Sequence, residues 1–208
     1  MIFTISTKIN LSGDAQNTGS SLESAVLKPH GAAQMKRTVW TFGLIAGAIL
    51  SIMMVITFPF LDEIGHDKGA VIGYTTMVLA FLMTFFGVKS YRDNVGGGSI
   101  SFGRAFALGL LITAVATACY VATWEVIYWK FAPDFGEKYA AYAVEKVKKS
   151  GAPQAEIDAK TKEMAEFNRM YKNPLINIAF TSLEPLPVGL LIALVSAGLL
   201  RRKQPTLA

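Results

Sequence analysis

The sequence predicts an all-α fold: a polytopic membrane protein with four transmembrane helices and an extracytoplasmic helical hairpin between helices 3 and 4. Two observations predict it. Long apolar runs recur four times, and the charged residues gather between them. About 20 apolar residues let a helix cross the ~30 Å hydrocarbon core, and the runs lack the alternation of membrane β-strands. The expected helices cover residues 39–61, 70–88, 101–131 and 174–201.

Residues 1–34, before the first helix, are polar and rich in Ser, Gly and Asn, without the basic and apolar regions of a signal peptide. We expect them to form a disordered tail. Met35-Lys36-Arg37 has the form of a protein start, so the tail is alternatively an upstream extension of the reading frame. Residues 204–208 form a short C-terminal tail.

Lysines and arginines in short loops predict the orientation, because they mark the cytoplasmic side of a multi-pass protein. They precede the first helix, occupy the second connection and follow the fourth helix, whereas the first connection has one lysine among three acidic residues. Both termini are therefore expected in the cytoplasm. The residues concerned are Lys36, Arg37, Lys89, Arg92, Arg104, Arg201, Arg202 and Lys203.

The net charge of +5 would suggest a nucleic-acid partner in a soluble protein. Here the basic residues lie beside membrane helices, and no basic face is interleaved with aromatic residues. Membrane lipids are the expected partners, and nucleic acid is not. The single cysteine, Cys119, lies within the third apolar run, where it is expected to be a small buried hydrophobic residue.

The long connection between the third and fourth helices predicts a helical hairpin over residues 134–172. Asp134 and Glu137 have the spacing of a capping box, with Asp134 able to accept from first-turn amides. The first helix is expected to stop at Ser150, and a second to run from Pro153 to Tyr171. The alternative is a solvated, charged spacer.

Small residues recur at every fourth position in the four runs, which predicts close helix packing in one chain or between subunits. The members are Gly43, Gly47 and Ser51; Gly69 and Gly73; Ala114, Ala118 and Ala122; Gly189, Ala193 and Ala197. Aromatic residues at the run ends are expected to form interfacial belts. These are Trp40 at one end and Trp124, Tyr128 and Trp129 at the other.

Two acidic residues, Glu125 and Glu184, stand within apolar runs, and ionisable groups there are candidates for function. Counted along its helix, Glu125 lies at the outer interface and Glu184 lies within the hydrocarbon. Pro185 and Pro187 follow Glu184 and remove two amide donors, so they predict a helix break. An acid beside a broken helix is typical of cation sites in transporters, but a structural kink gives the same pattern.

The candidate intramembrane polar site joins these acids to nearby polar residues. We expect Glu184 to bond a neighbour such as Asn177 or Tyr128 if the kink is structural. Thr113, Thr117 and Glu125 form a polar stripe that is expected to face Glu184 under either interpretation.

No enzyme motif emerges. The glycine-rich segment at residues 91–99 lacks the Gly-Lys-Ser/Thr of a phosphate loop, and Ser99 or Ser101 is expected to cap the third helix. The two histidines, His30 and His66, are solitary. We therefore expect no catalytic residue, no metal site and no cofactor.

Several stretches together resemble a bacterial membrane family known as domain of unknown function 4199. They are Tyr91-Arg92-Asp93 with Gly96-Gly97-Gly98, Ser101-Phe102-Gly103-Arg104-Ala105-Phe106, and Glu184-Pro185-Leu186-Pro187-Val188-Gly189 through Leu200-Arg201-Arg202-Lys203. The similarity covers residues 36–203. It implies a four-helix membrane domain in a bacterial envelope, without functional residues to carry over.

The leading functional prediction is a non-enzymatic protein of the bacterial inner membrane, an envelope assembly or accessory factor whose outer hairpin contacts lipid headgroups or a partner. The alternative is a small proton- or cation-coupled transporter that works as an oligomer, since four helices rarely enclose a pathway.

The orientation gives a direct test. In a Cys119→Ala background, a cysteine placed at Ser150 should react with a membrane-impermeant thiol reagent in intact spheroplasts, because the hairpin is expected outside the cytoplasm. A cysteine placed at Gly97 should react only after lysis. The reverse labelling pattern would overturn the orientation.

Overall fold

The computed structural model describes the backbone of residues 12–202 and the side chains of residues 31–202. Helices dominate the described chain, as the apolar runs predict. In chain order the elements are α1 (Ser12–Thr57), η1 (Phe58–Phe60, a short 3-10 helix), α2 (Leu61–Ile64), α3 (His66–Asn94), α4 (Phe102–Lys130), α5 (Phe135–Lys149), α6 (Gln154–Tyr171), α7 (Pro174–Leu183) and α8 (Pro185–Leu200).

Four helical segments of the described chain are long and apolar enough to cross a membrane, which confirms the polytopic all-α prediction. They are Gly31–Ile64, His66–Asn94, Phe102–Lys130 and Pro174–Leu200. The last comprises α7 and α8 together. Each is longer than the ~20 residues needed to cross the hydrocarbon core. The helices therefore continue beyond their apolar parts into segments that carry charged residues. The helix predicted at 70–88 therefore extends to His66 and Asn94.

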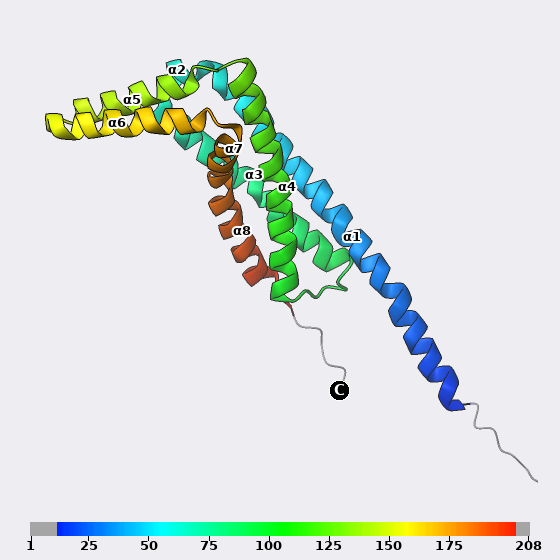
Figure 1. Cartoon of the computed structure of the whole chain (residues 1–208). Coiled ribbons are helices and arrows are strands. Elements are labelled where there is room, and N and C mark those ends of the chain that lie inside the picture. The colour runs from blue at the N-terminus through cyan, green and yellow to red at the C-terminus, as the bar shows by residue number, and fades with distance from the viewer. Residues whose placement is uncertain (1–11, 203–208) are drawn as a thin grey trace, which may run out of the picture.

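The four spans form a bundle in which α1 and α8 each pack against both α3 and α4. The α5–α6 hairpin projects sideways at one end of this bundle, close to α2 (Figure 1). The start of α1, the connection at residues 95–101 and the end of α8 lie toward the opposite end (Figure 1). We call these the hairpin end and the terminal end.

Helix α1 begins at Ser12, well inside the segment expected to be a disordered tail. Helix propagation costs far less than nucleation, so the span that starts near Gly31 can extend backward through a segment containing Ala, Leu, Glu and Lys. Residues 1–11 of the expected tail, and the C-terminal residues 203–208, lie outside the described residues.

Glycines hold α4 close to its two neighbours. A Cβ atom added at Gly47 of α1 would come within 2.6 Å of the Cβ of Cys119, and one added at Gly189 of α8 would overlap the Thr113 side chain. Helices that pack this closely gain dispersion contacts, which drive association in lipid. The small-residue patterns of α1 and α8 therefore serve packing within one chain.

The small residues of α4 behave differently. Ala114, Ala118 and Ala122 are exposed and line an open apolar groove beside α1. The opposite face of α4 carries the buried contacts instead. The belt prediction is also wrong for two of its members, because Trp124 and Tyr128 are buried in a cluster near the hairpin end.

The hairpin forms as predicted from α5 and α6, which pack on each other. Asp134 stands at the start of α5, but its carboxylate pairs with Lys138 at 3.2 Å instead of capping the first turn. That ion pair one turn along competes for the same oxygen atoms. The expected cap of α4 is Ser101, whose hydroxyl accepts from the Arg104 amide at 3.4 Å.

Polar and aromatic contacts tie the hairpin to α3. Lys146 donates to Asp67 at 2.7 Å, and the rings of His66 and Tyr142 stack with centroids 4.4 Å apart. The hydrogen bond to Asp67 raises the pKa of Lys146 above its ordinary value, so the ammonium form persists through the physiological range. The pair is exposed, and such pairs hold orientation more than they stabilise a fold.

The glycine contacts predict an asymmetry along α8. Gly189→Ala should destabilise the bundle by about 1–3 kcal/mol, because the added methyl group overlaps Thr113. Gly198→Ala is the matched control on the same helix, since nothing lies within 4 Å of its added Cβ. Denaturant unfolding in detergent micelles measures both. Equal stability of the two variants would contradict the packing described.

Candidate functional site

The fourth span is interrupted at Glu184, where the prolines predict a break. Helix α7 ends at Leu183 and α8 begins at Pro185, with Glu184 between them at φ −71° and ψ −57°. The proline rings remove donors to the preceding turn. Pro185 is buried, whereas Pro187 is exposed.

The carboxylate of Glu184 accepts a hydrogen bond from the hydroxyl of Tyr120 on α4, at 2.6 Å. The partners expected from the sequence, Asn177 and Tyr128, bond elsewhere or pack elsewhere. Because α4 packs against α7 and α8, Tyr120 comes opposite the break although it is 64 residues away in sequence. Tyrosine in an apolar run has no polar signal of its own, so the sequence did not single it out.

Glu125 does not join Glu184. Its carboxylate accepts from Nε1 of Trp129 at 2.8 Å, one turn along the same helix. Five residues separate Glu125 from Tyr120, which turns the two side chains about 140° apart around α4. The expected convergence of the two acids is therefore wrong.

Asn177 belongs to a buried chain of hydrogen bonds that joins α4, α6 and α7. Nε1 of Trp124 donates to the hydroxyl of Tyr171 at 2.8 Å, and that hydroxyl lies 3.3 Å from Oγ1 of Thr181. Thr181 in turn donates to Oδ1 of Asn177 at 3.2 Å. Burial raises the pKa of Tyr171, so its hydroxyl stays protonated. This chain fixes the hairpin base to the bundle.

The other predicted residues lie in the packed core. Thr113 and Thr117 are buried, and neither hydroxyl has a hydrogen-bond partner within the described part of the chain. Thr113 faces Gly189, not Glu184. Tyr128 packs edge-on against Tyr171, with ring centroids 5.4 Å apart. The polar stripe on α4 therefore contributes to helix packing and not to the Glu184 environment.

Glu184 lines a cavity between the hairpin and the bundle. Two adjoining hollows of about 340 and 250 Å³ share its walls. The shared lining residues are Tyr74, Phe135, Tyr139, Tyr171, Thr181 and Glu184. They come from α3, α5, α6, α7 and the α7–α8 break. Four aromatic rings around one carboxylate favour a cationic group, because ring faces and carboxylate both attract positive charge.

The cavity closes toward the middle of the bundle. Met77 lines it and is buried. Met77 also belongs to a buried apolar cluster that fills the space between the spans. The other members are Ala46, Leu50, Ala80, Phe81 and Ala116. The arrangement can therefore hold a small cation or the end of a longer side chain at the hairpin end. Farther along the described bundle, the hydroxyls of Thr84, Thr113 and Thr117 are buried without a hydrogen-bond partner and do not form a connected polar path.

The described residues offer no metal centre, because no three His, Cys, Asp or Glu side chains within them form a group suited to holding an ion. The cavity presents the Glu184 carboxylate, the His66 imidazole and aromatic faces, together with several hydroxyl groups. The hydroxyls belong to Thr181 and to Tyr74, Tyr120, Tyr139 and Tyr171. Such groups bind and orient a cation without covalent chemistry.

Comparison with known proteins gives a family. The family described as "Protein of unknown function (DUF4199)" matches residues 41–202, which include most of the first span, the other three spans, the hairpin and the cavity. No curated protein and no solved structure matches the chain.

The buried chain of hydrogen bonds makes Tyr171 a sensitive position. Tyr171→Phe should destabilise the protein by about 1–3 kcal/mol, because it leaves the buried Nε1 of Trp124 without an acceptor. Tyr74→Phe, on the same cavity wall but outside this chain of bonds, should change stability little. Thermal unfolding followed by tryptophan fluorescence compares them. A silent Tyr171→Phe variant would show that the bonds do not anchor the hairpin.

Proposed function

Since the chain belongs to the DUF4199 family of unknown function, we propose from its geometry that it is a non-enzymatic accessory protein of the bacterial inner membrane. Its hairpin end lies outside the cytoplasm and recognises a positively charged group of an envelope protein partner. The single observation that carries this proposal is the aromatic cavity around Glu184.

The proposed orientation rests on charge. Basic residues cluster at the terminal end, where Arg104, Arg201 and Arg202 lie close to one another. Short basic segments remain in the cytoplasm when a membrane protein inserts. Both termini are accordingly cytoplasmic in this proposal, and the cavity opens on the extracytoplasmic side.

The chemistry of the cavity sets the class of ligand. A lysine ammonium or a methylated amine fits both the carboxylate and the ring faces, whereas an anion would be repelled by Glu184. The size also agrees, because a hollow of a few hundred Å³ accepts one side chain or small cation and excludes a folded domain. We infer that a lysine side chain of the partner enters, while the hairpin surface forms the surrounding contact.

The closed floor supports binding over transport. Met77 lines the cavity and is buried, and Phe81, one turn along α3, is buried in the same cluster. Phe81 and Thr113 both contact the position of Gly189 on α8. A cation on this route would meet a few buried hydroxyls, such as those of Thr84, Thr113 and Thr117, among apolar side chains. It would lose most of its hydration shell, which is costly in an apolar core.

One observation favours the second candidate, a proton- or cation-coupled transporter acting as an oligomer. Glu184 stands beside a broken helix in the fourth span, as in known transporter sites. The exposed alanine face of α4 would then meet a second copy of the chain.

Ligand titration tests the leading proposal. Lysine ethyl ester or tetramethylammonium added to the detergent-solubilised protein should change the fluorescence of Trp124, which lines the cavity. Glu184→Gln keeps an oxygen for Tyr120 but removes the charge, so the probes should bind about tenfold more weakly or worse. Glu125→Gln, the matched control outside the cavity, should bind as the wild type does.

Other outcomes separate the two candidates. Equal binding by the wild type and Glu184→Gln would overturn the cavity proposal. Proton or cation flux in proteoliposomes that Glu184→Gln abolishes would establish the transporter instead, because coupling requires the ionisable group itself. Flux that survives this substitution would exclude Glu184 from transport.

A further inference from the structure

A second pocket, of about 1140 Å³, opens at the terminal end of the bundle. It lies between the α3–α4 connection, the first turn of α4 and the residues that follow α8. Three arginines, Arg104, Arg201 and Arg202, line it, together with the hydroxyl-bearing residues Ser99 and Ser101. Among the described residues, none that lines the pocket is acidic. Positive charge therefore gathers here, at the opposite end of the molecule from Glu184.

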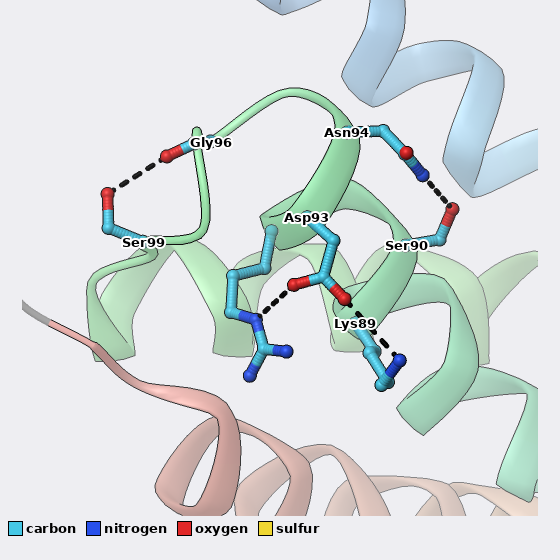
Figure 2. A network of polar contacts seen from close by, with 7 residues as sticks. Lys89, Ser90, Asp93, Asn94, Gly96 and Ser99 are labelled. Atoms are coloured by element: carbon cyan, nitrogen blue, oxygen red, sulfur yellow. Dashed lines mark hydrogen bonds and ion pairs between the residues drawn. The ribbon is translucent and has the colours of Figure 1, made fainter.

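Two neighbouring basic residues, Lys89 and Arg92, share one acidic partner. Asp93 pairs with Nζ of Lys89 at 3.4 Å and with Nε of Arg92 at 2.7 Å, as Figure 2 shows. Its carboxylate points away from the loop that carries Gly96 and Ser99, whose side chain bonds back within that loop (Figure 2). Asp93 therefore pairs with two residues of its own helix, α3, and does not balance the positive charge of the pocket arginines.

None of the three pocket arginines has an ion-pair partner among the described residues. All three are exposed. Like charges that face one pocket repel one another, and an anion bound among them removes that repulsion. The protein itself supplies no such anion at this place within the described chain.

The backbone holds the arginines together although they are distant in sequence. The Ile100 amide donates to the Arg202 carbonyl at 3.1 Å, and the Arg202 amide donates back at 3.0 Å. The hydroxyl of Ser101 caps the first turn of α4, and this turn carries Arg104. Side chains from two separate segments are therefore directed to one pocket before any ligand binds, which lowers the entropic cost of binding.

The pocket also has an apolar side at membrane depth. Phe102 lines it, is exposed and stacks on Phe106 with centroids 6.0 Å apart. Phe102 begins one membrane span and Leu200 ends another, so the pocket lies where hydrocarbon meets headgroups. A free anion would contact only the arginines, whereas a lipid can place its phosphate against the arginines and its acyl chains against the apolar wall.

We propose that this pocket binds the phosphate of an anionic phospholipid, such as phosphatidylglycerol or cardiolipin, in the leaflet at the terminal end. The guanidinium groups bind phosphate oxygens through paired N–H donors. The Phe102 side of the pocket contacts the glycerol backbone and the first methylene groups. Basic pockets between membrane helices recognise anionic headgroups in this way.

Native mass spectrometry of the full chain tests the proposal, with phosphatidylglycerol, cardiolipin and phosphatidylcholine as separate probes. The wild type should retain both anionic lipids in preference to phosphatidylcholine. An Arg104→Gln/Arg201→Gln/Arg202→Gln variant should bind them about 100-fold more weakly, at about fivefold for each arginine. The control is Lys36→Gln/Arg37→Gln/Lys89→Gln, which removes the same charge from exposed residues outside this pocket and should keep most of the binding.

Three outcomes would overturn the proposal. Undiminished anionic-lipid binding by the arginine variant would exclude the pocket. An equal loss of lipid affinity in the arginine variant and in the control would show that the lipids respond to surface charge in general and not to this pocket. Inorganic phosphate that displaces the lipid at millimolar concentration and binds equally well alone would identify a free-anion site. Thermal unfolding of both variants shows whether each remains folded. If the triple arginine variant does not fold, the single variant Arg201→Gln replaces it, and its affinity for the anionic lipids should fall about fivefold.

Discussion

Close backbone approach between α4 and its neighbours is the interaction on which the rest of the structure depends. Lipid tails are as apolar as the side chains of these helices, so water gives no force that brings the spans together. Association instead requires many short contacts, and glycines allow them where α1 and α8 meet α4. Gly47 admits Cys119, and Gly189 admits Thr113. Every other feature is positioned relative to α4.

The break at Glu184 separates two parts of the fourth span that pack against different neighbours. α8 must lie close to α4 at Gly189, while α7 must meet α6 at the base of the hairpin. The prolines remove two amide donors at the junction of α7 and α8, and the buried bonds of Tyr171 and Thr181 hold α7 against the base of the hairpin. The cavity lies beside this junction, between α3 and the hairpin.

The spans, the hairpin and the break were predictable because each depends on local signals: apolar length, capping residues and proline. The partner of Glu184 was not predictable, because 64 residues separate it from Tyr120 and sequence spacing does not tell which face of α4 meets α8. The alanines of α4 show the same limit. Their spacing matches that of Gly43 and Gly47, yet Ala114 faces outward and the glycines face inward.

Competition between local partners accounts for a further difference. Asp134 has the position of a cap and also lies one turn from Lys138, and the ion pair takes the carboxylate. The sequence does not tell whether Asp134 caps the helix or pairs with Lys138, because each interaction stabilises a helix by about 2 kcal/mol or less. The helix begins at Phe135 in either case, so its existence was predictable while the contact at its start was not.

The two polar ends share the α4 and α8 pair, which raises the question of communication between them. Tyr120 and Arg104 lie about 24 Å apart along α4, and the bundle between them is filled with apolar side chains and buried threonines. No chain of hydrogen bonds among the described residues links the two ends, because the hydroxyls of Thr84, Thr113 and Thr117 have no partner. Only sliding of α8 along α4 would connect them, and the contact of Gly189 with Thr113 resists such sliding because closely packed helices have few alternative registers. The hairpin cavity and the arginine pocket are therefore expected to act independently in one chain.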